Sequence, residues 1–175
     1  MRVETTLDKF TDTNSSVYQL HFPIPIDIAN HFIEGDQRRV ICTINDSIKI
    51  SSGLMPFKEY WYILVNQELQ KKLQIDIGDS VTLELAKDES KYGMSMPLEF
   101  ETVLNQDKLA SEYFHLLTPG KQRNLIYIVS KVKNTDSRIN KALAIIDHLL
   151  ETSGKLDFKQ LNVKIKEYNQ RGKLK

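Results

Sequence analysis

Apolar and polar residues alternate along six short stretches in the first half of the chain, the pattern of half-buried β-strands. The six stretches are residues 3–7, 17–22, 40–44, 48–50, 60–65 and 81–85, and a turn cluster occupies 12–16. Asn45-Asp46 carries side chains suited to a tight turn, and short helices are predicted over 26–33 and 67–73. Many short strands separated by turns predict a small β-barrel or closed sheet of about six strands.

Beyond residue 90 the apolar residues follow a helical period instead. Thr118-Pro119 has the form of an N-cap followed by proline at the first helical position. A helix then runs to Asn134-Thr135, and the next, whose apolar face is marked by Ile139, Leu143, Ile146 and Leu150, ends at Gly154. Asp157 with Gln160 forms a capping box for the last helix, in which Phe158, Leu161 and Ile165 are expected to face inward. The predicted class is α+β: an N-terminal barrel at 1–90, connecting helices at 91–117, and a helical segment at 118–170 packed on the barrel.

Composition and charge refine this prediction. The chain has 175 residues, 41% of them hydrophobic and 27% charged, which is ordinary for a globular protein. No apolar run approaches the length of a membrane span, and no signal-peptide core follows Met1, so we expect a cytoplasmic protein with no membrane partner. Residues 1–117 hold 11 Lys and Arg against 18 Asp and Glu, a net charge of −7, whereas residues 118–175 hold 13 against 5, a net charge of +8. This asymmetry indicates either two mutually attracting parts or a basic surface for an acidic partner.

The usual catalytic patterns are missing from the sequence. Cys42 is the only cysteine and lies in an apolar strand, where it is expected to be a buried small residue. Four scattered histidines show no metal-binding spacing and are expected near the surface, and the seven glycines form no phosphate-binding loop. We therefore predict no catalytic residue, no metal and no cofactor. An enzyme would need a site assembled from distant residues, with Lys87, Asp88 and Tyr92 as the best candidates.

The N-terminal part resembles a small domain of unknown function grouped with the double-split β-barrels, the architecture of AbrB/MazE-type proteins. The segments that carry this resemblance are 39–45, 54–56, 60–66, 69–73 and 78–83, ending near Lys87-Asp88. The resemblance implies a double-split β-barrel and a bacterial protein. Although AbrB/MazE-type proteins include DNA-binding relatives, the acidic N-terminal part would repel phosphate, so specific nucleic-acid binding is not expected.

The C-terminal part is similar to the helical YdeI/OmpD-associated (bacteriocin-protection) segment. The residues that carry this similarity are 114–123, Ile128, Lys131, 133–135 and 138–139. Neither resemblance implies a defined activity. The chain is therefore expected to be an uncharacterised non-enzymatic binding or accessory protein.

Two arginines are the sharpest candidates for a binding site. Arg123 and Arg138 lie on consecutive predicted helices, and a helical hairpin would bring them towards each other. Because arginine recognises carboxylates and phosphates in a bidentate way, we expect them either to pair with acidic residues of the barrel or to hold a small anionic ligand or protein partner. The expected place is the boundary between barrel and helices, near Asn45 and Tyr60.

Overall fold

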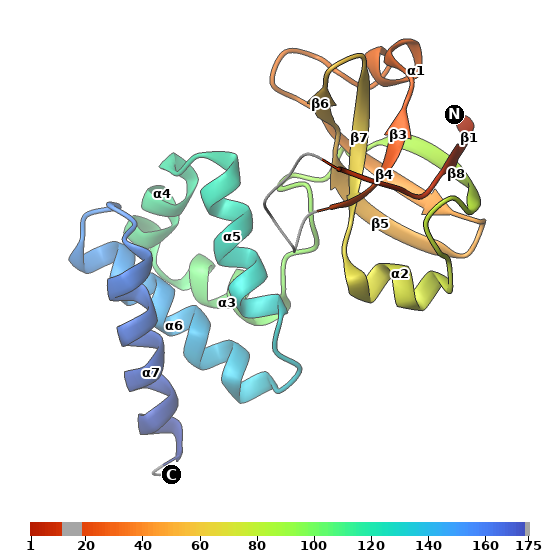
Figure 1. Cartoon of the computed structure of the whole chain (residues 1–175). Coiled ribbons are helices and arrows are strands. Elements are labelled where there is room, and N and C mark those ends of the chain that lie inside the picture. Colours follow the sequence, from red (N-terminus) through yellow and green to blue (C-terminus); the bar gives the residue numbers. More distant parts are fainter. Residues whose placement is uncertain (12–18, 174–175) are drawn as a thin grey trace. The chain divides into compact units, whose positions relative to one another are not determined.

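The computed structural model describes residues 1–11 and 19–173. The chain divides into two compact units, Met1–Glu89 and Ser90–Lys175 (Figure 1). Each unit has its own buried apolar cluster, and the two clusters share no residue. The predicted turn at 12–16 and Val17 lie outside the described residues.

The N-terminal unit contains two four-stranded antiparallel sheets. In spatial order the first sheet consists of β1 (Arg2–Thr6), β8 (Ser80–Lys87), β4 (Arg39–Ile44) and β5 (Ile48–Gly53). The second consists of β2 (Asp8–Lys9), β3 (Leu20–Ile24), β7 (Tyr60–Val65) and β6 (Met55–Phe57). Two short helices complete the unit, α1 (Ile26–Asn30) and α2 (Gln67–Leu73).

The α+β class is confirmed, but among the described residues the strands form no closed barrel, and there are eight of them rather than six. Two of the eight strands, β2 and β6, lie beyond the predicted ranges 3–7 and 48–50, and each begins where the chain passes from one sheet to the other. β1 gives way to β2 at Leu7, whose backbone bonds to Asp79 O and Gly78 N instead of to a strand. β5 gives way to β6 at Leu54, whose N–H donates to Arg38 O. Both leucines are buried, so each corner is fixed by the core that it enters.

The turn at Asn45-Asp46 and helix α2 form where they were predicted, because a few neighbouring residues determine each of them. Asn45 and Asp46 both have positive φ, 48° and 53°, as a type I′ hairpin turn requires. Asn66 caps α2 by accepting a hydrogen bond from Leu69 N at 2.7 Å, and Gln74 ends the helix in the left-handed region at φ 55°. Cys42 is fully buried as expected, and burial raises the pKa of its thiol to about 12. It is therefore no nucleophile at neutral pH.

Five helices form the C-terminal unit (Figure 1), and none of the helices within residues 1–11 and 19–173 is long and apolar enough to cross a membrane. They are α3 (Leu98–Gln106), α4 (Lys108–Leu116), α5 (Pro119–Ser130), α6 (Thr135–Glu151) and α7 (Phe158–Lys173). α6 packs against each of the other four helices. Small buried residues on α6, such as Ala142 and Ala144, allow these helices to approach it closely. Its C-terminal turn ends at Gly154 (φ 78°), where an added Cβ would lie 3.0 Å from the Tyr113 ring.

Candidate functional site

A groove of about 460 Å³ lies between β5, β7 and α2 in the N-terminal unit. This volume is within the range of about 300–1,000 Å³ that is usual for small-molecule sites. Its lining residues come from three segments that are far apart in the sequence: Ile48–Ser52 of β5, Leu64, Val65 and Asn66 at the end of β7, and Glu68, Leu69 and Lys72 of α2. In Figure 1, β7 leads directly into α2 below β5.

The groove opens where β5 and β7 diverge. β6 pairs with β7 from Tyr60 to Tyr62, whereas β5, which precedes β6 across Leu54, pairs with β4 instead. On the opposite side of the unit, where β1 approaches β3, Thr5 Oγ1 donates to Pro23 O at 2.8 Å and links the two sheets. The two sheets are thus tied together on the β1–β3 side and separated by the groove on the β5–β7 side.

Two lysines give the groove its charge. Lys49 and Lys72 line it with a single carboxylate, that of Glu68, and no carboxylate in the described part of the chain bonds either lysine. Five apolar residues line the groove beside them, Ile48, Ile50, Leu64, Val65 and Leu69, and Ser51, Ser52 and Asn66 add polar groups. A mainly apolar surface with a few polar groups and two free cations can orient an anionic ligand.

The two candidates from the N-terminal unit lie apart in its topology, Asn45 in the turn between β4 and β5 of the first sheet and Tyr60 at the start of β7 in the second. Asn45 fills a structural role, because its Oδ1 accepts from Thr82 N at 2.9 Å while its own N–H donates to Thr82 O. Tyr60 belongs to an aromatic cluster on the outer face of the second sheet, formed by Phe10, His21, Phe57, Tyr60 and Tyr62. Its hydroxyl lies 3.0 Å from His21 Nε2. Burial is the main cause that raises the pKa of Tyr60, and the negative charges of Asp8 and Tyr62 add to it.

The two candidate arginines lie on α5 and α6, which pack together, and among the described residues only Arg138 has a hydrogen-bond or ion-pair partner. Arg138 Nε donates to Val132 O at 2.8 Å, and its Nη1 lies 3.3 Å from Glu99 Oε1 on α3. Lys141 Nζ, one turn further along α6, donates to Ile128 O at 3.0 Å. The two side chains therefore satisfy carbonyls at the C-terminus of α5, a position that favours cations. The expected boundary site with Asn45 and Tyr60 stays a prediction.

The residues considered for an enzyme site are engaged in separate local contacts. Lys87 pairs with Glu34, and this contact lowers the pKa of the Glu34 carboxyl. Asp88 N–H donates to Arg39 O in the N-terminal unit. Tyr92 belongs to the C-terminal unit, where its hydroxyl lies 2.9 Å from His115 Nε2. His115 Nδ1 donates to Ser111 O at 2.7 Å, which leaves Nε2 as the acceptor for the Tyr92 hydroxyl.

The expectation that every histidine lies near the surface is wrong for two of the four. His21 and His148 are each only 1% exposed, whereas His31 and His115 are exposed. His21 stacks on Phe10 at 3.8 Å between ring centroids, and its Nδ1 faces Gln19 O. Burial lowers the pKa of both buried histidines. His21 contacts Gln19 and Tyr60 through its ring nitrogens and His148 contacts Asp157 through Nε2, burial that a scan for metal-binding spacing does not detect.

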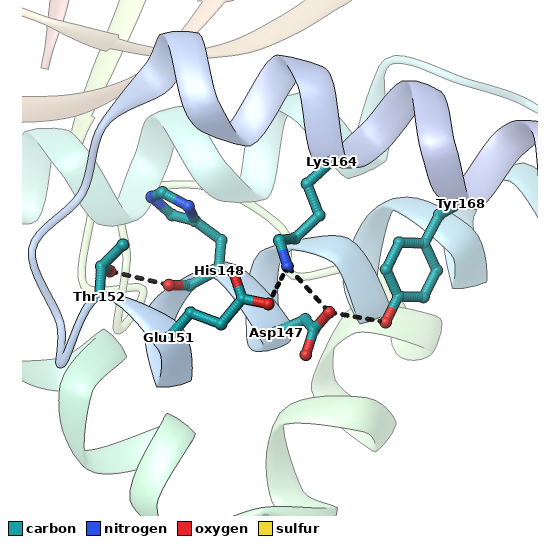
Figure 2. Close-up of polar contacts among 6 residues, drawn as sticks. All are labelled: Asp147, His148, Glu151, Thr152, Lys164 and Tyr168. Atoms are coloured by element: carbon teal, nitrogen blue, oxygen red, sulfur yellow. Dashed lines mark hydrogen bonds and ion pairs between the residues drawn. The ribbon is translucent and has the colours of Figure 1, made fainter.

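A polar network joins α6 to α7 (Figure 2). Lys164 of α7, whose side chain is 13% exposed, lies 3.0 Å from Asp147 Oδ2 and also bonds Glu151. Tyr168 donates its hydroxyl to the same Asp147 oxygen at 3.0 Å. The interactions link residues of α6 and α7 to one another, so the network holds the two helices together.

His148 provides a pH test of the same helix pair. Its Nε2 accepts a hydrogen bond from Asp157 N–H at 3.1 Å. Burial is the main cause that lowers the pKa of His148 from 6.5, and the charge of Lys164 lowers it further, whereas Asp157 and Glu151 act in the opposite direction. Below pH 6.5 the unfolded chain binds a proton that the folded chain excludes, so the unfolding free energy should fall as the pH falls. Urea unfolding followed by circular dichroism at about pH 7.5 and about pH 5.5 measures this loss.

The matched control for this prediction is His148→Gln, whose amide oxygen can still accept from Asp157 N–H but does not titrate. The variant should lose less stability on acidification than the natural chain. Equal losses in the two proteins would show that His148 is not the responsible group.

Sequence reasoning missed the groove residues Lys49, Ser51, Ser52, Asn66 and Lys72. The only available signal was Lys49 between two isoleucines of a predicted strand, which is also the pattern of any solvated strand face. In the described part of the chain no group of three or more His, Cys, Asp or Glu side chains could hold a metal ion.

Comparison with known proteins gives families for both units. No curated protein matches the chain. α7 lies beyond the matched C-terminal region. Residues 4–85 match the family described as "Domain of unknown function (DUF1905)" and residues 94–152 the family described as "Bacteriocin-protection, YdeI or OmpD-Associated", so each unit is similar to the family that its sequence resembles.

Proposed function

We propose that this chain is a non-enzymatic binding protein whose N-terminal unit takes an anionic ligand or partner in the groove between β5, β7 and α2. The observation that carries the proposal is the pair Lys49 and Lys72, which line an open groove together with five apolar residues. A lysine held in a structural ion pair contributes little to recognition, whereas these two are available to a ligand.

The contrast with other basic residues supports this choice. Lys87 is paired with Glu34, Lys164 with Asp147 and Glu151, and Arg138 with Glu99. In each case the cation already has an acidic partner within the same unit. Lys49 and Lys72 combine an unoccupied charge with a concave surface, which favours the groove over the Arg138 region as the anion site.

Replacing both groove lysines should remove anion binding. We expect inorganic phosphate or citrate to raise the melting temperature of the N-terminal unit, because a ligand that binds only the folded state stabilises it. The double variant Lys49→Gln and Lys72→Gln should weaken the affinity by about tenfold or more, since two charge-assisted contacts are lost. Fluorescence of Trp61, the only tryptophan, follows this unit, and calorimetric titration gives the affinity.

Lys71→Gln is the matched control, because Lys71 is an exposed lysine in the same last turn of α2 but does not line the groove. It should bind like the natural chain. If Lys71→Gln weakened binding as much as the double variant does, the loss would reflect the net charge of the unit and not contacts in the groove. Undiminished binding by the double variant would disprove the site.

We also propose that the N-terminal unit is an opened form of the double-split barrel that the AbrB/MazE resemblance implies. If β1 is joined to β2 across Leu7, and β5 to β6 across Leu54, six strands follow one another in a ring. The groove lies in this ring between the last part of β7 and β5. The bacterial origin implied by the resemblance is likewise a proposal.

A further inference from the structure

The groove runs along the edge of β5 rather than over one face of it. Successive residues of a strand point to opposite faces of the sheet. Ile48, Ile50 and Ser52 therefore face one side, and Lys49 and Ser51 face the other, yet all five line the groove. Leu64 and Val65, consecutive residues of β7, also both line it. A cavity bordered by both sets of side chains lies against the backbone edge.

Both of these edges lack a neighbouring strand in the described part of the chain. β5 pairs with β4 alone, and no further backbone hydrogen bond is made by Ile48–Gly53. β7 pairs with β3 along its length, but on its other side β6 reaches only from Tyr60 to Tyr62. An exposed strand edge presents unpaired N–H and C=O groups that can pair with another chain.

The side chains indicate what kind of strand would fit. A strand added to β5 places its own alternate residues beside Ile48 and Ile50 on one face and beside Lys49 on the other. Apolar residues suit the first face, and acidic residues suit the second, with Lys72 of α2 as a further cation in the groove. A second copy of this chain adding its own β5 would bring two lysine-bearing strands together, which like charges disfavour.

From this geometry we propose that the occupant of the groove is an extended segment of a partner protein, alternately apolar and acidic, that adds as a strand to the free edge of β5. This proposal rests on the proposed function and names its partner. The segment occupies the wide end of the groove beside Ile48–Ser51, because β5 and β7 converge towards Leu54. Backbone hydrogen bonds to β5 would supply affinity, and the alternation of side chains would supply selectivity.

The test uses the full chain and a short blocked peptide of alternating valine and glutamate. The peptide should bind, and it should slow hydrogen exchange at alternate amides of β5, those that point away from β4. Two further peptides of the same sequence carry N-methyl groups on alternate backbone nitrogens, one at the odd and the other at the even positions. Both keep every charge but lose half of the backbone donors, and the peptide that loses the donors facing β5 should bind about tenfold less tightly than the parent. A valine–lysine peptide should not bind.

The outcomes separate this proposal from the proposed function. If both N-methylated peptides bind as well as the parent, or β5 amides stay unprotected, strand addition is wrong, while sensitivity to Lys49→Gln and Lys72→Gln would leave the anion site standing. If phosphate binds through the lysines and the peptide does not bind, the site takes small anions only and strand addition is again wrong. Dimerisation through β5, seen by sedimentation, would identify a second copy as the occupant and overturn the proposal.

Discussion

Phe114→Ala is expected to lower the unfolding free energy of the C-terminal unit by about 3–5 kcal/mol, the usual loss when a buried phenylalanine is truncated. Phe114 is fully buried on α4 and packs edge-on against Phe100 of α3 and Tyr92, at 5.5 and 5.8 Å between ring centroids. Removing its ring leaves a cavity between these partners. Urea unfolding followed by circular dichroism at the helical band measures the loss, because this unit supplies five of the seven helices.

The control is Leu116→Ala on the same helix, two residues further on, where the side chain is exposed. It should change stability by less than about 0.5 kcal/mol, as surface substitutions usually do. Similar losses for the two variants would contradict the buried cluster described for the C-terminal unit.

Arg138→Ala is expected to destabilise the same unit by about 1.5–3 kcal/mol, the range for hydrogen bonds that involve a charged group. The Arg138 side chain is 30% exposed and that of Glu99 only 15%, so truncation leaves a largely buried carboxylate without its cation and Val132 O without its donor. Arg138→Lys should recover part of the loss, since one ammonium cannot reproduce both contacts. Denaturant unfolding measures all three proteins.

Arg123→Ala provides the comparison, because Arg123 is also half-buried but has no hydrogen bond or ion pair among the described residues. It should be close to neutral. If Arg138→Ala leaves stability unchanged and instead abolishes stabilisation by an anion, the original expectation of a ligand site at Arg138 is right and the structural role is wrong.

Local structure could be predicted where a short segment determines it. The range 67–73 of α2 and the turn at Asn45-Asp46 depend on caps and backbone preferences within a few residues. The corners at Leu7 and Leu54 were not predicted, because β2 and β6, the strands that follow them, lie beyond the predicted ranges 3–7 and 48–50 and are two and three residues long. Alternation cannot be recognised over so few residues, so six strands were predicted where the described part of the chain has eight.

Burial on several sides also limits prediction from periodicity. Leu143 was expected to mark the apolar face of its helix but is 37% exposed, whereas Ala142 and Ala144 are buried, because α6 is contacted by four helices. Phe158, expected to face inward, is 36% exposed at the first position of α7, while Leu161 and Ile165 face inward as predicted.

The groove itself could not be predicted, since it depends on which strand is missing beside β5 and β7. Such a gap is a property of long-range pairing, and neither Lys49 nor Lys72 differs locally from an ordinary surface lysine. The sequence predicts an anionic ligand at Arg123 and Arg138 of the C-terminal unit, whereas the site that we propose uses two lysines of the N-terminal unit.

The most direct measurement is an amide NMR titration of the natural chain with inorganic phosphate, repeated with the Lys49→Gln and Lys72→Gln double variant. The proposed site predicts saturable shifts at residues 48–52 and 64–72, which line or border the groove, and their loss in the double variant. Shifts that avoid these segments and gather instead around Arg123 and Arg138, unchanged in the double variant, would contradict it.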